Sequence, residues 1–306
     1  MDPIFLLEQL LNGLGYGFML FLLAAGLTLV FGIMDMLNLA HGALFLVGGY
    51  VAAMIHAHTG SFVGAVVAAV AVTTLLALLL ETTLIRRLYK RDHLSQVLAT
   101  FGLILIADDA VKYIWGPSPM MAPTPPALAG PIQLLPGLPY PAYRIVILVA
   151  GLVIAIGLYL LVNKTRAGML VRAGASNRAM AELMGVRVGQ VFTSVFLLSA
   201  ALAAVAGALM GPISAVQIGM GEDIMIPALV VIVIGGIGSV RGAFVAALLV
   251  GLVDTAGRAF LPPLLRTVLP SALAADIGPA LASIAMYVLM ALVLVIKPSG
   301  LFPARA

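Results

Sequence analysis

Long apolar runs alternate with short polar segments along the whole chain, and most runs are long enough to cross a lipid bilayer. A transmembrane helix needs about 20 consecutive apolar residues. Two runs are shorter, 43–57 and 224–239, and we expect broken or partly inserted helices there. The pattern predicts an all-α polytopic membrane protein, one domain over residues 1–306, with about eight to nine transmembrane or partly inserted helices. The longer runs cover residues 6–33, 61–85, 94–115, 142–163, 188–210, 241–261 and 276–296.

Lysine and arginine gather in a few connecting segments, and this orients the chain. By the positive-inside rule, the segments 86–93, 164–187 and 297–306 lie on the cytoplasmic side. Arg258 and Arg266 then fall on the outer side, against the trend. The first apolar run follows the acids Asp2 and Glu8 instead of basic residues, so we expect it to be retained as a membrane anchor and not cleaved as a signal peptide.

The segment 116–141 differs from all other connections in the chain. It has nine prolines in 26 residues and carries no charge. A regular helix is excluded by the prolines, and the lack of charge favours the extracytoplasmic side. Two interpretations stay open: a connector stiffened by proline, or a platform for an extracytoplasmic partner.

Composition narrows the classes of function. With 63% hydrophobic and 9% charged residues, the chain is not an ordinary soluble domain. The absence of cysteine excludes disulfides and thiolate metal sites. The formal net charge of +4 would suggest nucleic acid in a soluble protein, but the basic residues lie in loops between spans, so membrane topology explains them and no nucleic-acid partner is expected.

The loop 164–187 concentrates the charge of the chain. Five basic residues stand against the single acid Glu182, a local net charge of +4 that equals that of the whole protein. The basic residues are Lys164, Arg166, Arg172, Arg178 and Arg187.

A short amphipathic helix is predicted inside this loop. Ser176 is a suitable N-cap and Gly185 can end the helix. Between them an apolar stripe at i, i+3 and i+4 has Arg178 and Glu182 beside it. The helix either rests on lipid headgroups or inserts into a groove on a cytoplasmic partner. The stripe consists of Met180, Leu183 and Met184.

A polar segment, DMLNLAHG at 35–42, interrupts the apolar pattern early in the chain. His41 lies there with Asn38 and Asp35, either to cap or pack a helix or to line a pathway. The sequence around His41-Gly42-Ala43 resembles that around Arg241-Gly242-Ala243, as a weak internal repeat or as ordinary glycine-rich helix packing.

Motifs for chemistry are largely missing. The chain has no G-x-x-x-x-G-K-[ST] sequence, so it has no P-loop for ATP. The glycines Gly235, Gly236 and Gly238 lie in an apolar stretch, which favours helix packing or a helix break over nucleotide binding. His56 and His58 fall on different faces of a helix and do not suggest a metal site.

Acidic residues within the spans are the remaining candidates for functional residues, because a charge inside a membrane is costly and usually has a function. Asp108 and Asp109 lie four and three residues before Lys112, so we expect pairing within one helix. We expect Glu81 to meet Arg86 or solvent. Asp254 has no evident cation close in the sequence.

Four stretches that together span most of the chain resemble the permease subunit of branched-chain amino-acid ABC importers. The loop 117–141 matches no pattern of that family, and Asp108-Asp109 stands where apolar or amide residues are expected. The four stretches are GLTLVFGIMDMLNLAHGALFLVGGYVAAM (26–54), TRAGMLVRAGASNRAMAELMGV (165–186), ALVVIVIGGIGSVRGAFVAALLVGLVD (228–254) and KPSGLFP (297–303).

The resemblance implies a multi-pass subunit of a bacterial inner membrane that forms half of a translocation path. Its implied partners are a second related permease subunit, two cytoplasmic ATPase subunits carrying ATP and magnesium, a periplasmic substrate-binding protein and membrane lipid. The chain itself would be no enzyme and hold no cofactor. Related importers take branched-chain amino acids, urea, short amides, aromatic acids or sugars, and the sequence does not name the substrate.

The resemblance also assigns roles to residues. It implies a coupling helix, seated in a groove of an ATPase subunit, formed by Ala175, Ser176, Asn177, Arg178, Ala179, Met180, Ala181, Glu182, Leu183, Met184 and Gly185. It places around the translocation path Asn38, His41, Gly42, Gly235, Gly236, Gly238, Ser239 and Gly242.

Two other classes of function are weighed against this one. A self-contained secondary transporter or channel needs its own ion-coupling charges inside the membrane, for which only Asp254 is a candidate. A membrane-embedded enzyme needs a catalytic or metal-ligating cluster, and no such cluster is evident in the sequence.

Overall fold

The structure, a computed structural model, describes residues 3–89 and 91–302. Asp2, position 90 of the basic segment 86–93 and positions 303–306 of the segment 297–306 lie outside these residues. Within them, eight helical segments are long and apolar enough to cross a membrane, which confirms the prediction of an all-α polytopic fold. They are α1 (Pro3–Met34), α2 (His41–Thr59), α3 with its extension (Phe62–Leu88), α5 (His93–Trp115), α6 (Ala142–Lys164), α9 (Val188–Met210), α11 (Val240–Leu265) and α12 (Ser271–Ile296).

Shorter elements complete the chain. The extension of α3 (Phe62–Leu80) consists of a π-helical turn, η1 (Glu81–Ile85), and α4 (Arg86–Leu88). The loop after α6 forms α7 (Arg166–Ser176) and α8 (Arg178–Leu183), and α10 (Met220–Gly235) precedes α11. The proline-rich segment contains η2 (Pro126–Leu128), β1 (Pro131–Leu135) and β2 (Leu138–Pro141).

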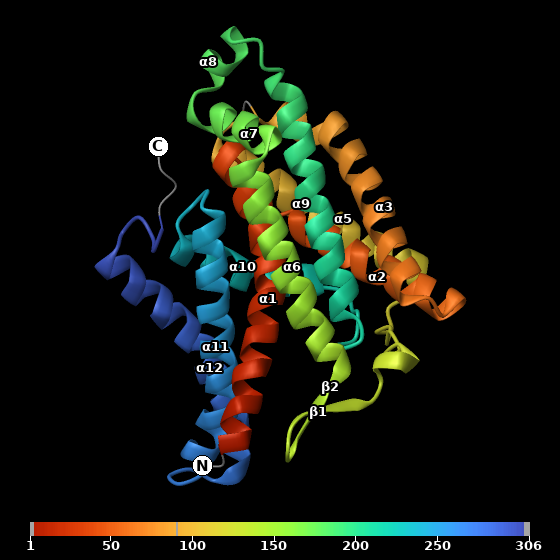
Figure 1. The fold of residues 1–306 in the computed structure, drawn as a ribbon, viewed down its shortest axis with the longest axis vertical. Helices are drawn as coiled ribbons and strands as arrows, with labels where there is room; N and C mark the ends of the chain where they lie inside the picture. The colour runs from red at the N-terminus through yellow and green to blue at the C-terminus, as the bar shows by residue number, and fades with distance from the viewer. Residues whose placement is uncertain (1–2, 90, 303–306) are drawn as a thin grey trace.

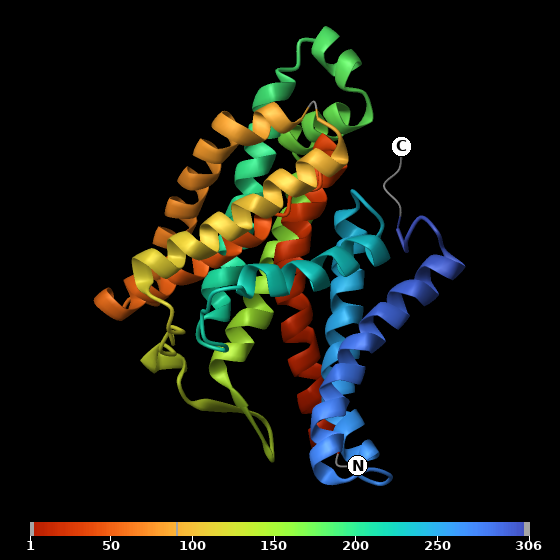
Figure 2. The same cartoon turned by 180° about the vertical axis from the view of Figure 1, so that it is seen from behind.

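Helix α1 forms the centre of the bundle. It packs against α11, α9 and α6, and its middle is almost completely buried, including Leu20, Leu23 and Val30. Figures 1 and 2 show it running through the middle of the molecule. A helix that is apolar all round is typical of a buried position, and the middle of α1 occupies one.

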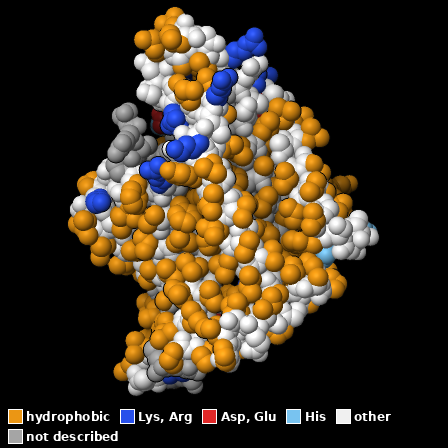
Figure 3. All heavy atoms as spheres, in the orientation of Figure 1, with side chains coloured by type: hydrophobic (Ala, Val, Ile, Leu, Met, Phe, Trp, Pro, Cys, Tyr) orange, Lys and Arg blue, Asp and Glu red, His pale blue; other side chains and the backbone are white. Residues whose placement is uncertain are grey.

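The two ends of the molecule differ in chemistry. α7 and α8 lie at one end, which we call the basic end, and Figure 3 shows Lys and Arg side chains gathered there above a largely apolar belt. The β1–β2 hairpin and the start of α1 lie at the other end, the hairpin end (Figure 1). This separation is the one expected for a chain whose basic loops share a side of the membrane.

The proline-rich segment 116–141 is more ordered than a plain connector. β1 and β2 pair antiparallel, with Pro131 opposite Pro141. Met120 forms a bridge to Val216 in the loop before α10, so the segment is attached to the bundle at a second point. No regular α-helix forms in it, as its prolines require.

Helix α2 is longer than the apolar run 43–57 suggested. It has 19 residues, because His41 and Gly42 begin it and His58 and Thr59 continue it. The helix forms after a turn in which Asp35 has a positive φ of 50°. Expecting a broken or partly inserted helix there was wrong, since buried contacts accommodate His41, which the hydropathy pattern counted as a boundary.

Helix α10 is the short element of the bundle, with 16 residues. Its first turn contacts Gly42 through Gly221, and its last turn contacts Gly242 through Gly235. In both contacts a Cβ on either glycine would overlap backbone atoms of its partner. The similar sequences that begin α2 and α11 therefore make the same kind of contact, at opposite ends of α10.

The residues after α12 complete the C-terminal end of α10. The amide of Leu301 donates to the carbonyl of Ile234 at 2.8 Å, and that of Phe302 donates to Gly235 at 3.0 Å. Helix ends leave carbonyls without partners, and the segment 297–302 supplies the missing donors. Gly236 and Gly300 allow this approach, with φ values of 99° and 82°.

We predict that Gly242→Ala destabilises the fold, because its new methyl group would meet the backbone of Gly235. Overpacking of this kind costs about 1–3 kcal/mol. Gly157→Ala is the matched control, because Gly157 lies in α6 with no atom within 4 Å of an added Cβ. Thermal unfolding of the purified chains in detergent should show a lower midpoint for Gly242→Ala alone. Equal midpoints would show that the two helices do not pack as closely as described.

Candidate functional site

The basic loop folds into two short helices separated by Asn177. Asn177 has an extended backbone, and its side chain accepts from the amide of Met180 at 2.9 Å, so it is the N-cap of α8. Ser176 is the last residue of α7. The prediction of Ser176 as N-cap was wrong, because Asn caps a helix as well as Ser does and the chain bends one residue later.

The end of α8 is as predicted. Gly185 follows with a positive φ of 82°, which ends the helix at little conformational cost. Arg178 and Glu182 form an ion pair at 3.1 Å along one side, and Ala181 is buried against the protein.

The apolar stripe of α8 faces away from the rest of the molecule. Met180, Leu183 and Met184 are 59%, 84% and 78% exposed. Folded proteins rarely leave several large apolar side chains together in water without a partner. This surface, which we call the α8 stripe, is therefore suited to contact with lipid headgroups or with a partner protein.

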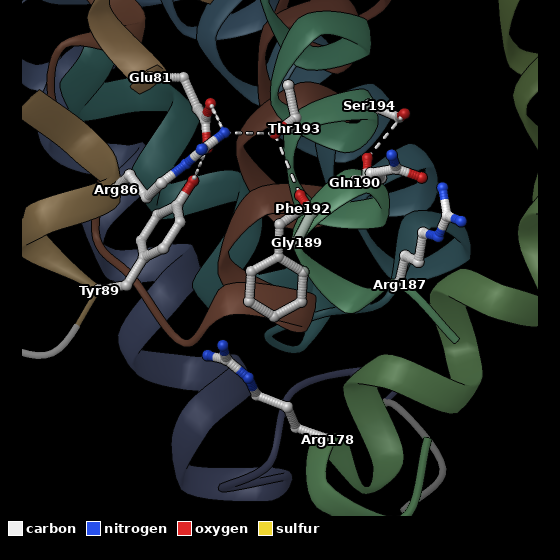
Figure 4. A pocket seen from close by; sticks show the side chains of 10 residues that line it. All are labelled: Glu81, Arg86, Tyr89, Arg178, Arg187, Gly189, Gln190, Phe192, Thr193 and Ser194. Carbon is white, nitrogen blue, oxygen red and sulfur yellow. Dashed lines mark hydrogen bonds and ion pairs between the residues drawn. The ribbon is translucent and has the colours of Figure 1, made fainter. Parts of the chain in front are cut away.

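A pocket of about 650 Å³ lies beside α8 at the basic end (Figure 4). The guanidinium of Arg178 stands over the ring of Phe192 at 5.1 Å, which joins α8 to α9. The pocket is lined by Glu81, Arg86, Tyr89, Arg178, Arg187, Gly189, Gln190, Phe192, Thr193 and Ser194.

Glu81 anchors the wall of this pocket. Its carboxylate is fully buried, and it accepts from Arg86 at 2.9 Å and from the hydroxyl of Tyr89 at 3.1 Å. Arg86 also donates to Thr193 of α9 at 3.2 Å (Figure 4). The expected meeting of Glu81 with Arg86 is confirmed.

The π-helical turn η1 makes this ion pair possible. Glu81 and Arg86 are five residues apart, a spacing that one π-turn brings onto the same face. Burial raises the pKa of the Tyr89 phenol, and the nearby Glu81 carboxylate raises it further. Tyr89 therefore keeps its proton and remains a donor to Glu81.

His41 connects three helices inside the bundle. Its Nε2 lies 3.0 Å from the carbonyl oxygen of Leu23 in α1, and its Nδ1 lies 3.2 Å from the hydroxyl of Ser199 in α9. A carbonyl only accepts, so Nε2 carries the proton, and a neutral ring accepts from Ser199 at Nδ1. Gly26 leaves room for the ring, because a Cβ there would lie 2.9 Å from His41.

Asn38 is buried beside His41 without satisfying its side chain. It is 1% exposed, and neither its Oδ1 nor its Nδ2 has a hydrogen-bond partner among the described residues. Burying such an amide without partners costs free energy, so Asn38 is a candidate for a role outside stability.

The glycine-rich turn between α10 and α11 is a helix break, as predicted. Gly236 and Gly238 have positive φ values, and Ser239 caps α11 by accepting from the amide of Gly242 at 3.1 Å. Gly238 also lies against Gly32 of α1.

The predicted path residues form two groups. One group is Asn38, His41 and Gly42 at the start of α2, and the other is the glycine-rich turn 235–242. They contact opposite ends of α10, whose rise of 1.5 Å per residue separates the two contacts by roughly 20 Å.

Two expectations about acids were wrong. Asp108 accepts from the amide of Gly219 at 3.2 Å, and no ion pair joins it or Asp109 to Lys112 in the part of the chain that the structure describes. Asp254 has a cation one turn away, Arg258, at 2.8 Å. The two residues are four apart, a spacing at which oppositely charged side chains on a helix can pair. Pairing with Asp254 also accounts for an arginine at the hairpin end.

The chain is similar in sequence to known proteins over nearly its whole length. Residues 9–295 match a family described as the permease component of branched-chain amino acid transport systems. No solved structure matches the chain.

Three relatives illustrate the similarity. The high-affinity branched-chain amino acid transport system permease protein BraD of Pseudomonas aeruginosa is 29% identical, over 96% of this chain and 95% of the relative. LivH of Escherichia coli, of the same description, is 27% identical over 97% and 96%. A probable branched-chain amino acid transport permease, LivH of Methanocaldococcus jannaschii, is 28% identical over 78% and 77%.

We predict that Asn177→Ala loosens α8, since an N-cap lost to alanine costs about 0.5–2 kcal/mol of helix stability. Amide hydrogen exchange should rise across 178–183, most clearly at Met180, whose amide loses its acceptor. Ser176→Ala is the control and should leave exchange in α8 unchanged, because Ser176 ends α7. A larger effect from Ser176→Ala would overturn the assignment of the cap.

Proposed function

We propose that this chain, which belongs to the family of permease components of branched-chain amino acid transport systems, forms half of the translocation path of an ATP-driven importer. The family match covers nearly the whole chain, and eight membrane-capable helices fit a multi-pass permease. In this proposal the basic end faces the cytoplasm, the hairpin end faces the outside, and the membrane is the bacterial inner membrane.

The observation that carries the proposal is the exposed α8 stripe. Figures 1 and 2 place α8 at the extreme of the basic end, past the ends of α3 and α6. A helix that rested on lipid headgroups would lie level with the ends of the spans, whereas α8 projects beyond them. A projecting helix with an apolar face suits a groove on a cytoplasmic protein.

The proposed partners are those that the family resemblance implies. This chain has no P-loop, so ATP and magnesium would be held by two cytoplasmic ATPase subunits. A second related permease would form the other half of the path, and a periplasmic binding protein would deliver branched-chain amino acids. The names of the relatives support this substrate class.

Contacts through α9 offer a route from α8 to the membrane core. Arg178 packs on Phe192 near the start of α9, and Ser199 two turns further bonds to His41. Further along, Gly207 of α9 lies against the carbonyl of Phe45 in α2. A displacement of α8 would thus reach the start of α2, where Asn38 lacks partners.

A self-contained secondary transporter is the alternative. It would need a free titratable group inside the membrane, and Asp254 was the candidate. The ion pair with Arg258 and the bond from Arg258 to Ser283 at 3.2 Å occupy that group. This observation favours the ATP-driven importer.

We predict that Leu183→Asp releases the ATPase subunits. Burying a leucine is worth about 1.5–3 kcal/mol, and a charge in its place would have to be desolvated. Arg178→Ala should weaken association less, because an exposed ion pair contributes at most about 1 kcal/mol. Pull-down of the ATPase subunits and substrate-stimulated ATP hydrolysis in reconstituted membranes measure both effects.

The control for this experiment is Leu134→Asp, which places the same charge on an exposed leucine of β1 at the hairpin end. It should leave association and hydrolysis unchanged. Normal association of the Leu183→Asp variant would mean that α8 docks no ATPase subunit.

We predict that Asn38→Leu separates stability from transport. The amide has no partner among the described residues, so an apolar side chain of similar size should leave the free energy of unfolding unchanged or raise it by at most about 1–3 kcal/mol. Uptake of radiolabelled leucine should fall if the amide meets solute or water during transport. Retained uptake would remove Asn38 from the path. Labelling of Asn38→Cys only by a lipid-confined thiol reagent would do the same.

A further inference from the structure

A second cavity lies near the hairpin end, between α1, α6, α11 and the end of α9. Its volume is about 210 Å³, below the 300–1,000 Å³ typical of pockets for drug-sized ligands. It therefore suits one small solute. It is lined by Gln9, Asn12, Gly15, Tyr16, Met19, Tyr140, Arg144, Ile147, Met210, Ile213 and Thr255.

The lining has a polar part and an apolar part. Arg144, Tyr140 and Asn12 form a hydrogen-bonded group, in which the Asn12 Oδ1 accepts from the Tyr140 hydroxyl at 3.0 Å and from the Arg144 guanidinium. The apolar lining comes from Met19, Ile147, Met210 and Ile213. A solute with a charged end and an aliphatic end matches this division.

Arg144 has no carboxylate partner among residues 3–89 and 91–302. The ion pairs there are Glu81–Arg86, Arg178–Glu182 and Asp254–Arg258. Glu8 is near enough to act on Tyr140, but it forms no ion pair with Arg144. A half-buried cation is costly to leave without an anion.

The guanidinium keeps donors free for such an anion. It has five N–H groups in a planar fork, and among the described residues it meets only the Oδ1 of Asn12 and the hydroxyl of Tyr140. A carboxylate can accept two of the others side by side. The hydroxyl oxygens of Tyr16, Tyr140 and Thr255 and the amide of Gln9 provide acceptors for an ammonium group.

We propose that this cavity is a binding site for the transported solute, in which Arg144 binds its carboxylate and the apolar lining receives an aliphatic side chain. The inference rests on the proposed function and deepens it, because it names the residues of this chain that would bind the two ends of a small aliphatic α-amino acid. Neutral solutes would leave the guanidinium of Arg144 without an anion. The guanidinium of Arg144 points toward α1 and away from lipid, because it bonds to Asn12 of α1 and lies beside the fully buried Tyr140.

The test measures binding of radiolabelled L-leucine to the full-length chain in phosphatidylcholine nanodiscs, without the binding protein. Arg144→Gln should weaken binding about 10- to 100-fold, the effect of losing one charge-assisted hydrogen-bonded pair. Arg266→Gln removes an exposed arginine from the same end and should change nothing. L-Leucinamide, which lacks the carboxylate, should compete poorly with leucine on the unsubstituted chain.

Asn12→Asp provides an independent test that does not depend on removing the guanidinium. It keeps the acceptor that Tyr140 and Arg144 share and places a carboxylate beside Arg144, so leucine binding should be lost while the unfolding midpoint holds or rises.

Several outcomes would overturn the proposal. Leucine binding that Arg144→Gln and Asn12→Asp leave intact would exclude the site, and so would equal competition by leucinamide. Leucine binding that phosphatidylglycerol in the nanodisc abolishes, through Arg144, would assign the guanidinium to a lipid headgroup. Pull-down of ATPase subunits by Arg144→Gln should be normal, which separates failure here from failure of the proposed importer function.

Discussion

The structure depends on giving partners to backbone groups inside an apolar bundle. A helix that ends within the bundle exposes carbonyls that neither lipid nor apolar side chains can satisfy. Helix α10 ends in this way at Gly235, and the amides of Leu301 and Phe302 donate hydrogen bonds to its last carbonyls. The segment after α12 thereby connects the last residues of the described chain to its core. The glycine contacts at both ends of α10 bring the backbones close enough for this arrangement.

Charged groups in the spans obey the same constraint. Glu81 is buried only because the π-turn places Arg86 beside it and Tyr89 donates a further hydrogen bond. Asp254 is paired by Arg258. Both pairs have an arginine that is about half exposed, so the cation stays partly hydrated while it neutralises the acid. Arg144 has no such acid among the described residues, which distinguishes it from these two arginines.

His41 and Arg178 connect the core to the basic end through α9. His41 bonds to both α1 and α9, and α9 reaches Arg178 of α8 through Phe192. The exposed face of α8 is the surface that an ATPase subunit would cover in the proposed importer. In the proposed importer, work done on α8 would arrive at the start of α2, near the unsatisfied amide of Asn38.

The sequence by itself determined the class of fold, the grouping of basic residues and the composition of the α8 stripe, because hydropathy and local spacing decide these. It also contains the pair of Asp254 with Arg258 at the helical spacing i, i+4. Other features join residues far apart in the chain, and local patterns carry no information about them. Examples are the bonds of His41 to Leu23 and Ser199 and the capping of α10 by residues 301–302. The local sequence does not decide between Asn177 and Ser176 as the N-cap of α8, because both residues cap helices well. Only the tertiary structure decided these contacts, and with them the separation of the two predicted path groups by α10 and the position of Arg144 beside Asn12.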